Sequence, residues 1–247
     1  MRGSSSPVPT DVGTAEVLAF VRRALPPPPL RVLEVGCGRG ELAAALIAAG
    51  YGVTALDADA QAVAVARAAG VPAVHADFLE ADAGVHDAVL FTRSLHHVRD
   101  LSLAVGRAAV ACAPGGLVVV DEFARERADA ATAGWFYDLR SLLSAAGVLA
   151  PPEPPPASDP LERWELEYGD RRPHRLHTGA GLVAALRDRF ELHEVEGCPY
   201  VYRQLAQWLE PSERGAAVAR VLLALERDRL ARGEVAPLGL HAVGSRR

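Results

Sequence analysis

Three glycines at the end of a short apolar run predict a point where the backbone approaches a ligand. Residues 30–35 are mostly apolar, and Gly36, Gly38 and Gly40 follow them. Glycine takes positive φ and has no Cβ, so a ligand can come close to the chain. A dinucleotide site has Gly-x-Gly-x-x-Gly spacing, but here the third position is Glu41, whose carboxylate would face a pyrophosphate unfavourably. A sulfonium cofactor with an ammonium group suits this turn better.

Two acids follow the next apolar runs. Asp57 ends the run at residues 53–56, and a carboxylate there can accept hydrogen bonds from both hydroxyls of a ribose. Dinucleotide sites place an acid in the same way, so Asp57 alone does not identify the cofactor. Asp77 follows the run at residues 73–75 and precedes Phe78. The alternative interpretation of both acids is a solvated loop carboxylate.

A pair of histidines, His96 and His97, follows the apolar run at residues 87–92. Imidazole titrates near neutral pH, so one of them, by preference His97, is a candidate general base facing the substrate. The alternative is a histidine that only shapes the loop. The pair has neither His-x-His nor His-x-x-x-His spacing, and the cysteines form no Cys-x-x-Cys pair, so no metal site is predicted.

These residues require alternating strands and helices to position them. The pattern predicts strands at residues 30–35, 53–56, 73–75, 87–92, 117–121, 190–195 and 238–243. It predicts helices at residues 11–25, 41–49, 59–69, 101–113, 128–146, 178–189 and 204–232, the last interrupted near Pro211. Strands alternating with helices indicate a parallel sheet covered on both faces, with ligands beyond the carboxyl ends of the strands.

At residues 30–122 the chain resembles the class I S-adenosylmethionine-dependent methyltransferases, whose first motif reads acid-x-Gly-x-Gly-x-Gly. The resemblance implies a doubly wound, mostly parallel, seven-stranded α/β sheet of Rossmann-like type with a helical lid insertion. It implies S-adenosylmethionine as the cofactor, and its site would include Glu34, Gly36, Cys37 and Gly38 at the methionine part, Asp57 and Ala58 at the ribose, Asp77 and Phe78 at the adenine, and Arg93 and Ser94 after the fourth strand. Many small-molecule members have a similar Leu-His-His segment.

The remaining residues are assigned by exclusion from this core. We predict one domain, with an N-terminal helix at 11–25, the cofactor core at 30–122, an insertion over the ligand edge at 123–177 and C-terminal helices and strands at 178–247. Trp135, Phe136 and Tyr137 are candidates either for packing an apolar acceptor or for the core. Asp121 and Glu122 either face the site or are buried acids that cap the next helix.

Composition limits the partners and the chemistry. Net charge is −5, and all 26 residues counted as Lys+Arg are arginine. The absence of lysine excludes a Schiff-base lysine, a phosphate-loop lysine and a Tyr-Lys dehydrogenase pair. The sequence has no long basic run, so nucleic-acid binding is not predicted. No apolar run approaches the ~20 residues of a membrane helix, and no signal segment is evident, so we expect a cytoplasmic protein without a membrane partner.

The sequence therefore predicts an S-adenosylmethionine-dependent O- or N-methyltransferase of a small molecule in secondary or specialised metabolism. Three alternatives are a dehydrogenase, a non-catalytic binding module that retains the fold, and a protein or RNA methyltransferase. Glu41 and the lack of lysine argue against the dehydrogenase, and the glycines with Asp57 and Asp77 argue against the binding module. The sequence indicates neither the acceptor nor the oligomeric state.

Overall fold

The computed structural model describes residues 6–169 and 176–247. Contacts between Cα atoms divide the chain into two compact units. Unit 1 comprises Met1–Ala15, Arg125–Arg175 and Gly197–Gly239, and unit 2 comprises Glu16–Ala124, Leu176–Glu196 and Leu240–Arg247. Residues 170–175 of the predicted insertion lie outside the described residues.

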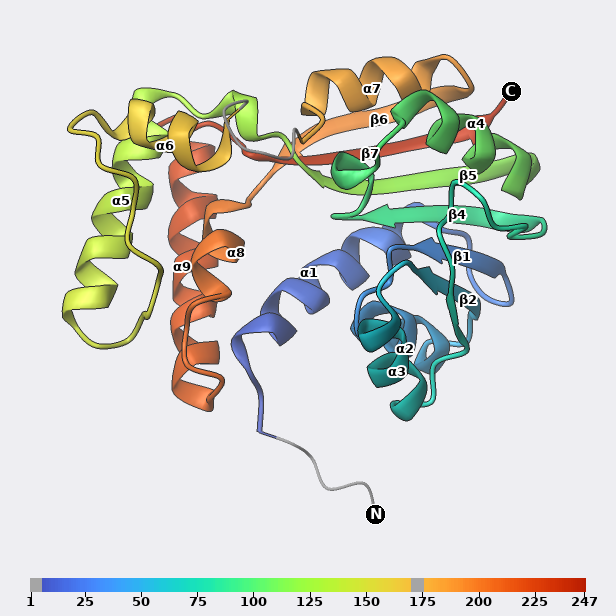
Figure 1. Cartoon of the computed structure of the whole chain (residues 1–247), viewed down its shortest axis with the longest axis horizontal. Coiled ribbons are helices and arrows are strands. Elements are labelled where there is room, and N and C mark those ends of the chain that lie inside the picture. Colours follow the sequence, from blue (N-terminus) through green and yellow to red (C-terminus); the bar gives the residue numbers. More distant parts are fainter. Residues whose placement is uncertain (1–5, 170–175) are drawn as a thin grey trace. The chain divides into compact units, whose positions relative to one another are not determined.

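Unit 2 is built on a seven-stranded sheet in the order β3-β2-β1-β4-β5-β7-β6 (Figure 1). The strands are β1 (Arg31–Val35), β2 (Gly52–Asp57), β3 (Ala73–His75), β4 (His86–Thr92), β5 (Cys112–Phe123), β6 (Phe190–Cys198) and β7 (Gly239–Arg246). The first five strands pair in parallel. This order and the seven strands confirm the predicted fold class.

The strand β7 runs antiparallel to β5. Near the end of β7, the Arg246 side chain donates a hydrogen bond to the carbonyl of Cys112 at the start of β5, with a nitrogen–oxygen distance of 2.5 Å. Near the start of β7, His241 meets Asp121 close to the end of β5. The start of β7 therefore lies at the same edge of the sheet as the carboxyl ends of the parallel strands.

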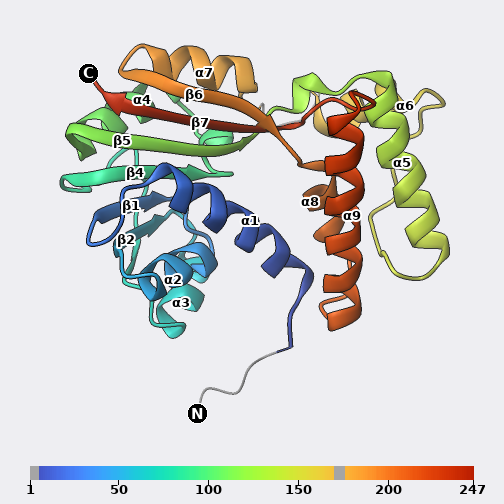
Figure 2. The ribbon, with the colours of Figure 1, turned by 180° about the vertical axis from the view of Figure 1, so that it is seen from behind.

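Helices cover both faces of the sheet, as seen in Figures 1 and 2. They are α1 (Pro9–Ala24), α2 (Glu41–Ala48), α3 (Ala60–Ala68), α4 (Leu101–Ala111) and α7 (Gly179–Arg187). Buried residues of α1, α2 and α3 form one hydrophobic core cluster with the sheet, and those of α4 and α7 form the other. The alternation of side chains along each strand sends neighbouring residues into different clusters, as with Val119 and Val120 of β5.

Unit 1 contains α5 (Ala130–Ala145), α6 (Pro160–Tyr168), α8 (Val201–Ala206) and α9 (Glu213–Ala231). The Phe136 ring of α5 packs edge-on against Trp164 and Tyr168 of α6, with ring centroids 5.3 and 6.0 Å apart. Arg140 is buried in an ion pair with Glu167, 2.9 Å between Nη1 and Oε1. Phe136 and Tyr137 of the predicted insertion are therefore core residues of this unit, whereas Trp135 is only partly buried.

The start of β5 contains an irregularity in its pairing with β4. His86 pairs with Cys112, but Ala88 pairs with Leu117, so residues 113–116 stand opposite Asp87 alone. Gly115 has φ 72°. Pro114, Gly115 and Gly116 lie between the predicted helix at 101–113 and the predicted strand at 117–121, and in the structure they belong to a bulge inside the strand.

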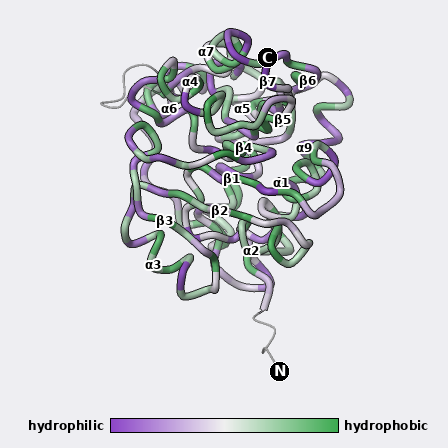
Figure 3. Tube along the Cα trace, turned by 90° about the vertical axis from the view of Figure 1, so that its right-hand side faces the viewer, coloured by the Kyte–Doolittle hydropathy of each residue, from purple (hydrophilic) through white to green (hydrophobic). Residues whose placement is uncertain are grey.

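None of the described helices combines the length and the apolar character needed to span a membrane. Figure 3 shows hydrophilic and hydrophobic residues interspersed along the helices.

Candidate functional site

The turn after β1 places two glycines in different surroundings. Gly36 has φ 75°, and a Cβ built on it would lie 2.3 Å from the Cβ of Ser94. Gly38 has φ 53°, and a Cβ there would meet nothing within 4 Å. Gly36 is therefore required for packing against the loop after β4, while Gly38 leaves its backbone open to a ligand.

Asp57 at the end of β2 fixes this turn. Its Oδ2 accepts a hydrogen bond from the Gly38 N–H (2.7 Å), and its Oδ1 accepts one from the Asp59 N–H (2.8 Å). An ionised carboxylate has about four acceptor positions, so two remain for a ligand. Ala58 is exposed between the two acids, and its carbonyl lies 3.1 Å from Nε2 of His75.

Glu34 in β1 is a buried acid with one oxygen unsatisfied. Its side chain receives a hydrogen bond from Thr92 at 3.4 Å on Oε1, whereas Oε2 has no partner among the described residues. Burial raises the pKa of the Glu34 carboxyl from 4.5 to about 8. Burial likewise raises the pKa of the Cys37 thiol to about 12, which argues against a nucleophilic role for Cys37.

Asp77 and Phe78 follow β3. The Leu79 N–H donates to Oδ1 of Asp77 at 2.8 Å, and Arg99 pairs with Oδ2. The backbone hydrogen bond from Leu79, with a further contribution from Arg99, holds the pKa of Asp77 below its usual value. Phe78 is buried and packs edge-on against Phe91, with centroids 5.8 Å apart.

The loop after β4 is tied to β1 and β5. Arg93 has φ 60°, the only positive φ of a non-glycine residue in the described chain, and its N–H donates to the Asp121 carbonyl at 2.7 Å. The Ser94 hydroxyl donates to the Val35 carbonyl at 2.6 Å. These bonds hold the loop beside the glycine turn.

Glu122 in β5 is the acid that organises the histidine segment. It is fully buried, and its Oε1 accepts from the N–H groups of Ser94 (2.9 Å) and Leu95 (2.6 Å). Its Oε2 pairs with Nδ1 of His96. His96 is buried, whereas His97 is exposed, with the two rings 4.1 Å apart. The structure thus gives His96 a buried carboxylate partner.

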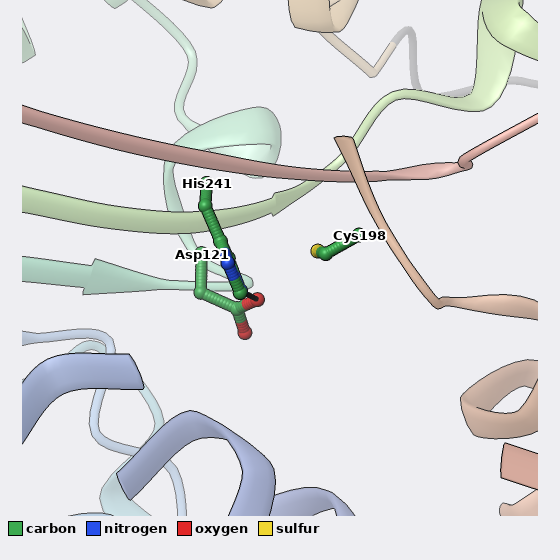
Figure 4. Close-up of side chains that lie close together, drawn as sticks. All are labelled: Asp121, Cys198 and His241. Carbon is green, nitrogen blue, oxygen red and sulfur yellow. Dashed lines mark hydrogen bonds and ion pairs between the residues drawn. The ribbon is translucent and has the colours of Figure 1, made fainter. Parts of the chain in front are cut away.

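A second carboxylate–imidazole pair lies on the other face of β5. Oδ1 of the buried Asp121 is 3.1 Å from Nε2 of His241, and Figure 4 shows these two side chains turned toward each other. The His241 ring stacks on Phe20, with centroids 3.7 Å apart. No local motif marks His241 in the sequence, and only the pairing of β7 with β5 brings it to this edge of the sheet.

Together, the ends of β1, β2, β4 and β5 bring most of the predicted residues to one edge of the sheet (Figure 1). Backbone N–H groups, carboxylates and an imidazole gather there, and a cation could pair with the free oxygen of Glu34. This edge offers groups that can bind a polar cofactor and accept a proton.

The comparison with protein families identifies this arrangement. A sequence profile described as "Methyltransferase domain" matches residues 13–169, more than half of the chain. The chain belongs to the methyltransferase domain family. The matched range includes residues 30–122, so the predicted resemblance to the class I S-adenosylmethionine-dependent methyltransferases is confirmed.

Curated relatives match a shorter part of this methyltransferase-family chain. An uncharacterized methyltransferase of Mycobacterium tuberculosis is 41% identical over 99 residues, covering 37% of this chain and 50% of the relative. A ubiquinone biosynthesis O-methyltransferase of a Caulobacter species is 33% identical over 100 residues, covering 37% of this chain and 40% of the relative. The matches therefore span half or less of these relatives.

Solved structures share the fold over nearly the whole chain. An S-adenosylmethionine-dependent methyltransferase from Mesorhizobium loti has a TM-score of 0.56 at 20% identity, covering 92% of this chain and 96% of that one. The N-methyltransferase NodS from Bradyrhizobium japonicum has a TM-score of 0.53 at 15% identity, covering 94% and 86%. At these identities the similarity shows the Rossmann-like methyltransferase fold.

Proposed function

We propose that the protein transfers the methyl group of S-adenosylmethionine to a hydroxyl or amine of a small molecule, in the cytoplasm. The free Oε2 of Glu34 carries this proposal, because it is buried next to the glycine turn and lacks a partner among the described residues. A ligand ammonium group would supply that partner and favour the ionised carboxylate. A pyrophosphate would not.

In this proposal, different residues of the chain contact different parts of the cofactor. Glu34, Gly36, Cys37 and Gly38 line the methionine part, Asp57 and Ala58 the ribose, Asp77 and Phe78 the adenine, and Arg93 and Ser94 contribute backbone. The Asp57 carboxylate accepts hydrogen bonds from the ribose hydroxyls at the acceptor positions that the N–H groups of Gly38 and Asp59 do not occupy. Asp77 accepts from the adenine amino group beside its bond to Leu79.

When bound, S-adenosylmethionine supplies an activated methyl group, so the protein has mainly to align the acceptor with it and exclude water. A histidine of the segment after β4 removes a proton from an acceptor that needs it. One matched protein supports a small-molecule acceptor: the Caulobacter protein is named a ubiquinone biosynthesis O-methyltransferase. NodS, which shares the fold, is named an N-methyltransferase and was solved with S-adenosyl-L-homocysteine.

Calorimetric titration with S-adenosylhomocysteine and, in parallel, with NADH tests this function. We expect binding of S-adenosylhomocysteine alone. Binding of NADH alone would favour the dehydrogenase, and binding of neither would favour a non-catalytic module.

The open position of Gly38 gives a variant that separates binding from folding. In Gly38→Ala the new Cβ has room in the protein, but it projects into the space proposed for the cofactor, so we expect S-adenosylhomocysteine to bind ~10–100-fold more weakly. Gly70→Ala is the matched control, because Gly70 also has positive φ (86°) and nothing within 4 Å of a built Cβ. Equal affinities of the two variants would contradict the placement of the cofactor at Gly38.

A further inference from the structure

A pocket lies in unit 2, away from the glycine turn. Its volume is about 380 Å³, which is within the size range of small-molecule sites. Residues of α4, residues directly after α7 and the end of β7 line it, and these segments come together near the end marked C in Figure 1. Since the end of β7 meets the start of β5, the pocket lies at the edge where the parallel strands begin. The candidate cofactor site is at the opposite edge.

One wall of the pocket is apolar and comes from α4. Gly106, Ala109 and Val110 share one face of this helix, because their spacing is i, i+3, i+4. Val110 is 71% exposed. A Cβ built on Gly106 would meet nothing within 4 Å, so packing inside the protein does not require glycine there, although glycine weakens a helix. This wall is therefore open to the apolar part of a ligand.

The other wall carries guanidinium groups. The Arg247 N–H donates to the Arg189 carbonyl at 3.3 Å, which holds these two residues next to each other. The Arg246 side chain is anchored by its hydrogen bond to the Cys112 carbonyl, and a guanidinium has five N–H donors, so most of them remain for a ligand. Arg189 and Arg247 are exposed, and neither forms an ion pair with another described residue.

The charge of this pocket is positive, although the net charge of the chain is −5. The lining residues include three arginines and one acid, Asp188. The C-terminal ends of α4 and α7 add roughly half a negative charge each, so the positive charges still exceed the negative ones. Guanidinium groups bind carboxylates and phosphates through paired, charge-assisted hydrogen bonds.

We propose that this pocket binds a small organic anion. Its phosphate or carboxylate group pairs with the arginines, and its apolar part packs against Gly106, Ala109 and Val110 of α4. The residues of the candidate cofactor site do not contribute to this pocket, so the inference goes beyond methyl transfer and does not depend on it.

Calorimetric titration with phenyl phosphate, benzoate and benzyl alcohol tests the binding. We expect at least one of the two anions to bind with a dissociation constant on the order of 1 mM or lower, and benzyl alcohol to bind at least ~10-fold more weakly. Tighter binding of phenyl phosphate would identify a phosphate ligand, and tighter binding of benzoate a carboxylate ligand. Binding of neither anion, or equally tight binding of benzyl alcohol, would overturn the proposal. So would displacement of the anion by S-adenosylhomocysteine, which would place the anion in the cofactor site.

Arg189→Gln tests the charged wall of the pocket. It removes an exposed guanidinium and should weaken binding of the anion by ~10-fold or more. Arg187→Gln is the matched control, because Arg187 is an exposed arginine at the end of α7 that does not line the pocket. Equal affinities of these two variants would overturn the proposal.

Gly106→Leu tests the apolar wall. The leucine side chain fills the space beside α4 and favours the helix, so this variant should fold and bind the anion ~10-fold or more weakly. Gly134→Leu in α5 is the matched control, since Gly134 is also inside a helix and has nothing within 4 Å of a built Cβ. An unchanged affinity of Gly106→Leu, or an equal loss in Gly134→Leu, would contradict the site. These results stand by themselves if the protein does not bind S-adenosylhomocysteine.

Discussion

Between roughly pH 5.5 and 7.5, the affinity of the protein for S-adenosylhomocysteine is expected to rise about tenfold per pH unit. Burial raises the pKa of Glu34 to about 8, so the carboxyl is mostly protonated in the free protein over this range. The ligand ammonium group favours the carboxylate, and binding therefore releases a proton. Titration calorimetry in buffers of different ionisation enthalpy should detect close to one proton released at pH 6.5.

Glu34→Gln is the control for this linkage, because the amide keeps the shape of the carboxyl and does not titrate. Its affinity should be weaker at pH 7.5 and independent of pH, without proton release. The unfolding free energy of the wild type should also fall relative to that of this variant as the pH rises from 4.5 toward 8, since the carboxyl loses its proton at a lower pH in the unfolded state than in the folded state. A flat wild-type affinity profile would rule out Glu34 as the partner of the ammonium group.

The second large effect is expected for Asp57→Ala, which should weaken S-adenosylhomocysteine binding by about 100-fold or more. The substitution removes the carboxylate that binds the Gly38 and Asp59 N–H groups and, in our proposal, the ribose hydroxyls. Hydrogen bonds to a charged group contribute about 1.5–3 kcal/mol each, so losing two of them at the ligand accounts for this factor. Calorimetry at fixed pH gives the affinity.

Asp59→Ala provides the comparison, since Asp59 also accepts from two backbone N–H groups, those of Gln61 and Ala62, but caps α3. It should cost about 1 kcal/mol of unfolding free energy and leave the affinity nearly unchanged. If both variants bind the ligand equally, the carboxylate of Asp57 does not contact it.

The sheet could be predicted from the sequence because its strands carry strong local signals. The run at residues 73–75 is identical to β3, and the glycines that follow β1 and α3 mark where these elements end. Seven strands in the predicted positions were sufficient for the fold class. The bulge in β5 was not predicted, because proline and glycine residues inside a strand give the same sequence pattern as a turn that precedes a strand.

The helix α6 was missed in the proline-rich part of the insertion. Its signals are present: Asp159 accepts from the Glu162 N–H as the N-cap, Pro160 occupies the first turn, and Trp164 and Tyr168 lie on one face. Proline is tolerated at the start of a helix because the backbone N–H that it lacks would have no partner within the helix. The residues that suggested a loop therefore begin the helix.

The site was predicted unevenly for a physical reason. The glycine turn, Asp57 and Asp77 lie in the segments directly after strands, where position along the chain is sufficient to place them. The pairing of Glu122 with His96 depends on the β4–β5 register and on which face of the strand the acid occupies. Consecutive acids on a strand point to opposite faces, and the sequence does not say which one meets the histidine.

The bulge at residues 113–116 makes one end of β5 suitable for protein engineering. Pro114 and Gly115 are exposed there, and neither residue is paired with a residue of β4 in the register. Extra residues inserted between them would lengthen the bulge without shifting the register of Leu117 to Asp121 against β4. A short peptide tag or a fluorophore could thus be attached at the end of the strand away from the two acids, leaving their alignment intact.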